Sequence, residues 1–529
     1  MKKIQQLQTG YIDAKNYSQR DHKEFFNQIF VKGDLLDSLC KSNVSFLIGE
    51  KGTGKTAYAT YLSNNEYKNI RATTKFIKAT DYSKFLKLKQ DKHLQLSNFE
   101  DIWKVIIYLL ISRQIRDIEK SMFNSYKFKT LNECIDKYYL DAFKPEILQA
   151  INVVEDSKGF AELMCKDYAK AGIESSKELS FTEQKFNLNL NYIQRKFEEA
   201  LSQLKLDKNH ILFIDGVDIR PDEIPFIEYQ ECIKGLANAI WWLNTEFFSN
   251  IRDSKGRIRV VLLIRPDIFN SLRLHNANAK LSDNSVFLDW RTDYKDFRTS
   301  RIFSIFDHFL RVQQSTDKDL SMGQSWDYYF QWQANNLHDP TLYQQNTSFI
   351  SFLRNSYYRP RDILKMIGLL KGNSTSIDFF QESDFLDSRF QRNYSNYLLG
   401  EIKDHLLFYY SEDDYNNFLK FFEFLNGSTE FSYDNYEKSF NKLIEYLEST
   451  SIQKPQFMTS SNEFLQFLFD LNVISYIEET SDQKKHIHWC FKDREYANIS
   501  PKVKTGLTYQ VFYGLTKALN LGKTFKDNR

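Results

Sequence analysis

A glycine-rich loop that directly follows an apolar run constrains this chain more than any other feature. Residues 49–56 read Gly-Glu-Lys-Gly-Thr-Gly-Lys-Thr, and residues 44–48 before them read Val-Ser-Phe-Leu-Ile. This is the P-loop pattern, in which backbone N–H groups surround a phosphate at the start of a helix. With only 18 Gly in 529 residues, a chance match has a probability of about one in a hundred or less. The sequence therefore predicts a nucleotide site built from a strand, a loop and a helix.

The residues of this loop have distinct expected roles. The Lys55 ammonium is placed to reach the β- and γ-phosphates, and the Thr56 hydroxyl is placed to bind Mg²⁺ at the start of the helix. The glycines let the backbone wrap the phosphates. ATP and Mg²⁺ are therefore the expected cofactors. The predicted binding residues are Gly49, Gly52, Thr53, Gly54, Lys55 and Thr56.

A second apolar run, far downstream of the loop, ends in a carboxylate. Residues 210–215 read His-Ile-Leu-Phe-Ile-Asp, which predicts a buried strand with Asp215 at its carboxyl end. A carboxylate in that place contacts Mg²⁺ in nucleotide-binding folds, so Thr56 and Asp215 are the predicted metal residues. Gly216 follows directly, and the next carboxylate is Asp218. Asp218 fits a catalytic base and a turn-forming residue equally well.

A third apolar run, residues 260–264, is followed by Arg265-Pro266-Asp267. In a doubly wound parallel sheet the carboxyl ends of the strands line the ligand crevice, so Arg265 and Asp267 are candidates for sensing a γ-phosphate or the attacking water. Asp267 also fits the first turn of a helix, and that interpretation is favoured. A helical segment before this run, about 227–248, fits a crossover between parallel strands.

Composition limits the class of protein without identifying a partner. Lys plus Arg total 71 against 69 Asp plus Glu, a net charge of +2, so no strong overall field attracts nucleic acid or an anionic membrane. Five scattered Cys favour reduced thiols over a disulfide framework. No apolar stretch is long enough to span a bilayer, and the first residues lack an apolar signal core, so we expect a soluble, cytoplasmic protein.

The order of these motifs resembles that of a known group of ATPases. Downstream of the three runs, residues 358–364 read Tyr-Arg-Pro-Arg-Asp-Ile-Leu. Over about residues 20–375 the chain resembles bacterial AAA+-like and STAND-like P-loop ATPases that carry an Arg-Pro-Arg-Asp element. The resemblance implies that Arg359 or Arg361 reaches the γ-phosphate from a helical lid, and it suggests defence against phage or mobile DNA. The expected catalytic residues are then Lys55, Asp215, Asp218, Arg359 and Arg361.

Helix capping offers a simpler account of part of the same element. Pro360 fits the first turn of a helix, and Asp362 fits a place beside the positive end of the helix dipole. Capping does not explain the two arginines.

The fold expected from these patterns is an α/β P-loop core with a parallel sheet, a helical insertion, a helical lid and a winged-helix-like C-terminal domain. The insertion is expected because about 150 residues separate the loop from the Asp215 strand, far more than a crossover needs. The expected ranges are 1–40 for an N-terminal segment, 41–300 for the core with its insertion at about 99–206, 301–394 for the lid and 395–529 for the C-terminal domain.

The C-terminal pattern consists of helical segments followed by two short strand-like runs. Residues 398–425 and 433–447 have helical patterns, and residues 473–477 and 486–491 have strand patterns joined by a polar turn. Helices before a hairpin fit a winged helix that binds DNA through Lys484, Lys485, His486 and His488. Because Glu478, Glu479 and Asp482 lie beside these lysines, a hairpin that packs on protein is favoured over one that binds DNA.

Three functional hypotheses are compatible with these observations. The first is a nucleotide-driven switch or motor that forms ATP-promoted homo-oligomers, with Arg291, Arg298 or Arg301 as a finger toward a neighbouring subunit. For any single one of these arginines, a solvated side chain or a pair with Asp293 or Asp296 is favoured over a finger. The second is a DNA-binding or scaffolding protein in which ATP is chiefly a regulatory or structural ligand, and the third is an origin- or transposon-type loader. No motif for effector chemistry stands out, so a partner effector protein is expected.

Overall fold

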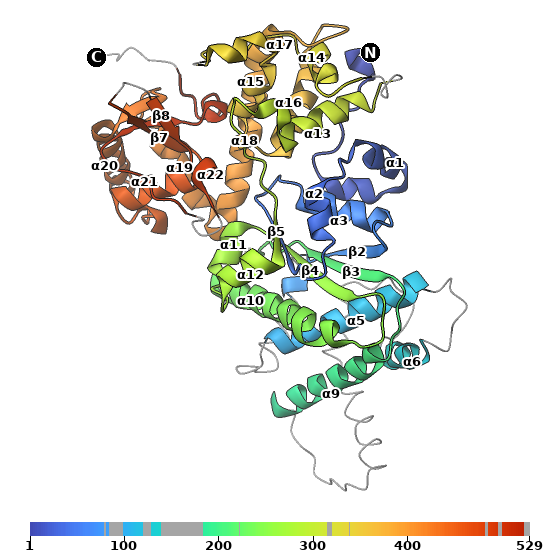
Figure 1. Ribbon diagram of the computed structural model, residues 1–529. Coiled ribbons are helices and arrows are strands. Elements are labelled where there is room, and N and C mark those ends of the chain that lie inside the picture. The colour runs from blue at the N-terminus through green and yellow to red at the C-terminus, as the bar shows by residue number, and fades with distance from the viewer. Residues whose placement is uncertain are drawn as a thin grey trace, which may run out of the picture. The chain divides into compact units, whose positions relative to one another are not determined.

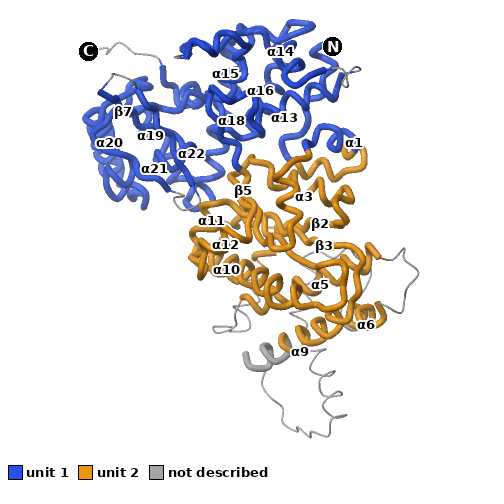
Figure 2. Tube along the Cα trace, viewed as in Figure 1, with its two compact units in different colours: residues 1–13, 24–31, 289–529 blue, residues 14–23, 32–288 orange. Residues whose placement is uncertain are grey.

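Two compact units divide the chain, which is seen here in a computed structural model. Unit 1 comprises Met1–Asp13, Glu24–Val31 and Asp289–Arg529, and unit 2 comprises Ala14–Lys23 and Lys32–Leu288, as Figure 2 shows. Each unit is described by itself. The structure describes residues 1–78, 81–83, 99–119, 128–138, 183–221, 223–314, 320–337, 339–481, 485–495 and 500–522.

A five-stranded parallel sheet forms the centre of unit 2 (Figure 1). The strand order is β2-β3-β4-β1-β5, so the strand before the glycine-rich loop lies between β4 and β5. The apolar runs of the sequence become strands because both faces of the sheet are covered, and β4 is buried along its whole length. The strands are β1 (Phe46–Ile48), β2 (Ile70–Phe76), β3 (Asn209–Asp215), β4 (Ile258–Ile264) and β5 (Ser285–Phe287).

Helices cover the two faces of this sheet, with α3 on one side and α5 and α10 on the other (Figure 1). The predicted crossover helix is α10, which ends at Trp242 and continues as a π-helical turn, Leu243–Phe247. The helices of this part of the chain are α1 (Arg20–Ile29), α2 (Asp34–Leu39), α3 (Lys55–Asn64), α5 (Phe99–Glu119), α6 (Lys129–Tyr138), α9 (Glu183–Ser202), α10 (Phe226–Trp242), α11 (Pro266–Ser271) and α12 (Ala277–Asn284).

The insertion was predicted at residues 99–206. Its described part consists mainly of the helices α5, α6 and α9. Helix α5 packs against α9 and α10, and the Tyr108 hydroxyl on α5 donates to Glu198 Oε1 on α9 at 2.8 Å. The rest of the predicted insertion, residues 120–127 and 139–182, lies outside the described residues.

In the longest segment of unit 1, Asp289–Arg529, the first helices pack against one another through a cluster of aromatic rings. Trp326 lies at the centre of this cluster, with its ring centroid 4.2 Å from that of Phe330 and 4.8 Å from that of Phe349. The long helix α18 follows. The helices up to that point are α13 (Arg301–Arg311), α14 (Gln324–Tyr329), α15 (Ser348–Asn355), α16 (Pro360–Asn373), α17 (Glu382–Leu386) and α18 (Ser388–Tyr409).

The C-terminal part of unit 1 combines helices with a four-stranded antiparallel sheet of order β6-β9-β7-β8. The predicted hairpin is present as β7 and β8, whereas β6 and β9 were not predicted. The elements are α19 (Glu412–Glu423), β6 (Glu430–Ser432), α20 (Tyr433–Ser449), α21 (Ser461–Asp470), β7 (Ile474–Glu479), β8 (Lys485–His488), α22 (Cys490–Asp493) and β9 (Thr508–Val511).

The predicted helical stretch 398–425 is two helices, α18 and α19. The break lies at Tyr410 and Ser411, where the Ser411 side chain accepts from Asp414 N and forms a capping box with the Asp414 carboxylate. The expected domain boundary at residue 395 falls inside α18. No helix among the described residues is long and apolar enough to cross a membrane.

Candidate nucleotide site

The predicted loop joins β1 to α3 in unit 2, at the carboxyl edge of the parallel sheet. Strand β1 ends at Ile48, and helix α3 begins at Lys55 with Gly54 as its N-cap. Gly54 has a φ of +101°, a left-handed conformation that favours glycine. The carboxyl ends of β3 and β4 lie at the same edge, because both strands run parallel to β1 through the register β3-β4-β1.

The loop is closed by hydrogen bonds to its own backbone. The Thr53 hydroxyl donates to the Glu50 carbonyl at 2.8 Å. The Lys55 Nζ donates to the carbonyls of Gly49 at 2.7 Å and Glu50 at 3.2 Å. Gly52 also has a positive φ, of +90°. The sequence did not indicate that the Gly49 and Glu50 carbonyls would hold the lysine.

Lys55 is a buried cation held by neutral groups. It is 8% exposed, and burial lowers the pKa of its ammonium, while Asp218 and Asp215 nearby oppose that shift. Among the described residues, no carboxylate lies within ion-pair distance of its Nζ. Its charge is therefore balanced by carbonyl dipoles and by carboxylates that are close without forming a salt bridge.

Thr56 and Asp215 meet as the sequence predicts for a metal site. The Thr56 hydroxyl donates to Asp215 Oδ2 at 2.7 Å, across 159 residues of sequence. Asp215 is 6% exposed, and burial raises the pKa of its carboxyl, as does Asp218, whereas Thr56 and Lys55 lower it. A hydroxyl and a carboxylate are oxygen ligands of the kind that Mg²⁺ takes when phosphates supply the other ligands. The residues present therefore fit this metal.

Asp218 lies in the turn after β3, half-buried and close to both charged groups of the site. Its charge shifts the pKa of Lys55 and of Asp215. Two buried tyrosines pack behind the turn: the Tyr229 hydroxyl donates to the Val217 carbonyl, and the Tyr82 ring lies 5.0 Å from the Tyr229 ring. Sequence reasoning missed these tyrosines, because no pattern links them to the turn.

Steric contacts at position 216 exclude a second acid directly after Asp215. Gly216 has a φ of +96°, and a Cβ at this position would lie 2.4 Å from the Ile77 carbonyl oxygen. Ile77 is fixed there because its N–H donates to the Asp215 carbonyl at 2.8 Å. Only glycine fits, so the next carboxylate of this turn comes at Asp218.

Arg265 lies at the carboxyl end of β4, and the sequence makes it a candidate for sensing the γ-phosphate or the attacking water. It is 2% exposed, and its guanidinium forms two hydrogen bonds to the Asp267 carboxylate, of which the Nε–Oδ1 bond is 3.0 Å long. Arg265 is also close enough to Lys55 to lower the pKa of that lysine. Helix α11 begins at Pro266 as expected, and Asp267 in its first turn is the partner of Arg265.

The two arginines of the Arg-Pro-Arg-Asp element lie in unit 1 and face carboxylates. Arg359 binds both oxygens of the Asp362 carboxylate, at 2.9 Å each, and Asp362 also accepts from Tyr357 N and from the Tyr397 hydroxyl. Arg361 Nη1 lies 3.6 Å from Glu401 Oε2. Pro360 and Asp362 lie in the first turn of α16, as the capping interpretation predicts, and the Asp362 carboxylate in addition joins Arg359 to Tyr397 of α18.

The three candidate finger arginines also belong to unit 1. Two of them pair with carboxylates other than Asp293 and Asp296, the partners considered from the sequence. Arg291 binds Asp289, and Arg298 binds both oxygens of Asp327 at 2.9 and 2.6 Å. Arg301 is the exposed first residue of α13.

The hairpin β7–β8 brings opposite charges together. His488 lies 3.0 Å from Glu478 and 3.3 Å from Asp493, while Lys504 lies 2.5 Å from Glu478 and Lys485 lies 3.5 Å from Glu479. Within the described ranges, no cluster of His, Cys, Asp and Glu could hold a metal ion. The predicted DNA contact Lys484 and its neighbour Asp482 lie outside the described residues.

Comparison with known proteins gives no relative on which to base a function. No protein-family model matches the chain, and no curated protein matches it significantly.

Proposed function

We propose that the chain is a Mg²⁺-dependent P-loop ATPase. The single observation that carries this proposal is the 2.7 Å hydrogen bond between the Thr56 hydroxyl and the Asp215 carboxylate, beside a loop that holds Lys55. These three groups come from two distant segments, and each has the chemistry that a nucleoside triphosphate with its metal requires. The proposed family is that of AAA+-like and STAND-like ATPases, and ATP is the proposed substrate.

The residues of the chain would divide the reaction as follows. Lys55 and the loop N–H groups hold the β- and γ-phosphates, while Thr56 and Asp215 hold Mg²⁺. When bound, the metal neutralises charge that develops on the phosphate oxygens. Asp218 orients the attacking water, since it is the next carboxylate after Asp215 in this turn and lies close to it.

The parts of the chain outside the nucleotide site suggest what ATP turnover would control. We assign a switch or motor role, in which the bound nucleotide changes the partners of the helical lid and of the winged-helix-like C-terminal part. The proposal includes homo-oligomers, a cytoplasmic location and a separate effector protein. It also includes a role in defence against phage. Activity per molecule should then rise with protein concentration. Mixing Arg301→Ala with Lys55→Ala protein should restore activity if the finger acts between subunits.

One observation favours a second candidate function. Arg359 and Arg361 each face a carboxylate of their own unit, so neither guanidinium needs a phosphate to balance its charge. A protein of this kind would bind ATP chiefly as a regulatory ligand of a DNA-binding or scaffolding chain. Because the hairpin charges are matched, duplex DNA should bind the full chain with a Kd weaker than about 10 μM at physiological salt.

Two measurements on the full chain test these functions. Equilibrium binding of ATP, with Mg²⁺ and with a chelator, tests the site, and release of inorganic phosphate tests hydrolysis. We expect Mg²⁺ to tighten binding, and Thr56→Val to remove most of that gain. Binding without turnover would favour the regulatory role, DNA-stimulated turnover would favour a loader, and absence of any ATP binding would refute the proposal.

A further inference from the structure

Unit 1 contains a pocket that the proposed ATPase reaction does not use. Its volume is about 340 Å³, which is within the usual range of small-molecule sites. It lies where the end of α15, helix α17 and the first turns of α18 meet the C-terminal segment that begins at Tyr513. All of its lining residues belong to unit 1, so it is independent of the loop and of Asp215 in unit 2.

Hydrogen bonds and close packing fix the walls of this pocket. The Tyr394 hydroxyl on α18 donates to the Asn355 carbonyl at the end of α15, at 2.7 Å. The C-terminal segment is attached to α18, since Ala518 N donates to Ser395 Oγ at 2.8 Å. Gly514 passes so close to α18 that a Cβ there would lie 2.5 Å from Leu398 Cδ1. The pocket is therefore preformed, and its floor at Gly514 is backbone.

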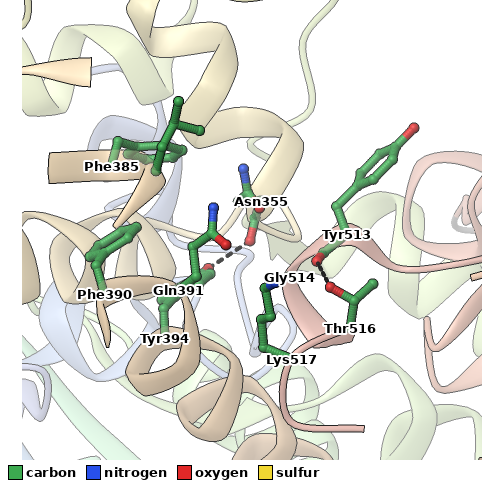
Figure 3. A pocket seen from close by; sticks show the side chains of 10 residues that line it. Asn355, Phe385, Phe390, Gln391, Tyr394, Tyr513, Gly514, Thr516 and Lys517 are labelled. Atoms are coloured by element: carbon green, nitrogen blue, oxygen red, sulfur yellow. Dashed lines mark hydrogen bonds between the residues drawn. The ribbon is translucent and has the colours of Figure 1, made fainter. Parts of the chain in front are cut away.

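Aromatic and apolar groups form the opposite sides of the pocket. Figure 3 shows Phe385 and Phe390 on one side and Tyr513 on the other. The Phe385 and Phe390 rings lie 5.2 Å apart, and the Tyr394 ring stacks on Phe390 with an interplanar angle of 5°. Tyr513 and Leu386 are 40% and 54% exposed, so a flat apolar ligand would remove their surfaces from water. Phe385 and Phe390 are buried and support this wall from behind, so Tyr513 is the aromatic ring on which a planar ligand could stack.

An amide lies between these two sides. Figure 3 shows the Gln391 side chain next to Asn355, between the phenylalanines and Tyr513. The Asn355 amide donates to Ser351 O at 2.9 Å, whereas the Gln391 amide makes no hydrogen bond to another described residue. A glutamine amide offers a donor and an acceptor side by side, which is the pattern on the edge of a heteroaromatic base.

The charge of the lining selects the sign of the ligand. Of the described residues around the pocket, Lys517 contributes an ammonium and none contributes a carboxylate. The Thr516 hydroxyl donates to the Tyr513 carbonyl at 3.1 Å, which leaves its oxygen lone pairs as acceptors. A ligand with a negative group near Lys517 and a planar ring on Tyr513 would contact the exposed groups of the site.

The geometry points to a second ligand site in unit 1 that binds a planar heteroaromatic base carrying a phosphate, the chemistry of a nucleoside monophosphate. The base stacks on Tyr513 and packs against Leu386 with its edge on Gln391, and the phosphate lies at Lys517. Because the pocket joins α18 to the C-terminal segment, the bound ligand would also stabilise the attachment of that segment.

Calorimetric titration of the full chain carrying Lys55→Ala, in a chelating buffer, tests this site while removing nucleotide binding at the proposed loop. The probes are AMP, GMP, adenosine and ribose 5-phosphate. We expect saturable binding of a monophosphate, weakened about tenfold or more by Lys517→Ala, because a charge-assisted hydrogen bond is lost. Gln391→Leu should weaken the monophosphate and the nucleoside alike. Lys438→Ala, an exposed lysine on α20, is the matched control and should change nothing.

The same titrations contain the results that would overturn the assignment. Absence of monophosphate binding at millimolar concentration would do so, as would equal affinities in Lys517→Ala, Gln391→Leu and the parent. In a further titration of the same protein, binding of a peptide that ends in phenylalanine, without binding of monophosphates, would show that the occupant is a chain terminus instead. Matching thermal unfolding curves establish that each variant is folded.

Discussion

Lys55 in unit 2 is buried and the side chain of Arg359 in unit 1 is only 11% exposed; each cation belongs to a motif that the sequence associates with phosphate, but their surroundings differ. Lys55 donates to two backbone carbonyls, whereas Arg359 forms a two-bond pair with Asp362. Arg291 and Arg298 follow the pattern of Arg359, since each binds a carboxylate of unit 1. A cation held by neutral groups gains from an anionic ligand, but a cation already paired must first lose its partner. This difference supports the proposed ligand-binding role of Lys55 and favours a structural role for Arg359.

The largest effect that would test this comparison is on stability. Asp362→Asn should lower the free energy of unfolding by about 3 kcal/mol or more, because it leaves the Arg359 guanidinium buried without its partner. The transition midpoint in urea measures the change, and Asp378→Asn, at an exposed aspartate of unit 1, is the control. A stable Arg359→Ala protein that has lost ATP hydrolysis would instead indicate that Arg359 acts on the nucleotide, and would contradict the structural role.

Lys55→Ala should have the next largest effect, and on function instead of folding. We expect kcat/KM for ATP to fall by about 10³-fold, because the site loses a preorganised cation for the phosphates. The unfolding transition should stay close to that of the parent, since only two carbonyl hydrogen bonds are lost. Lys51→Ala, in the same loop, serves as the control. Unchanged ATP affinity and turnover in folded Lys55→Ala protein would show that the loop is not the site.

The two carboxylates after β3 should separate in their effects. Asp218→Asn should slow hydrolysis by about 10²-fold with little change in ATP affinity, because a water-orienting base acts in the chemical step. Asp215→Asn should weaken Mg²⁺-dependent binding as well. Affinities measured with and without Mg²⁺ decide the matter, and equal losses in both variants would favour the turn role of Asp218.

A smaller effect concerns pH. The pKa of the Asp215 carboxyl is raised above the ordinary 3.8, chiefly by burial, so the folded state holds this proton more tightly than the unfolded state. Ionisation of Asp215 therefore costs stability as pH rises from about 3.8 through the raised pKa. In Mg²⁺-free buffer, Asp215→Asn should gain stability over the parent across that rise. Thermal unfolding from pH 4 to 7 measures the difference, and a constant difference would contradict the burial argument.

Local patterns in the sequence predicted the strand, loop and helix around Lys55, and the strand that ends at Asp215. They also indicated that Asp215 and Thr56 would meet, because carboxyl ends of parallel strands share an edge. The pairing of Arg298 with Asp327 could not be predicted, since it joins residues 29 apart that only tertiary packing brings together.

Other parts of unit 1 show the same limit. The strands β6 and β9 have only three and four residues, so their alternation of apolar and polar side chains covers too few positions to predict a strand. The pocket at Gln391 collects residues from four segments, so no single stretch of sequence carries its signal. In contrast, the Arg359–Asp362 pair was within reach of sequence reasoning, because its members are three positions apart at the predicted start of a helix.

The close approach of Gly216 to Ile77 has a consequence for the mutational history of this turn. Any single substitution that places an acid directly after Asp215 puts its Cβ against the Ile77 carbonyl and forces a left-handed φ on it. An adjacent acid could arise only if the end of β2 were rerouted in the same step. Position 216 and the path of the chain just after β2 are thus constrained together.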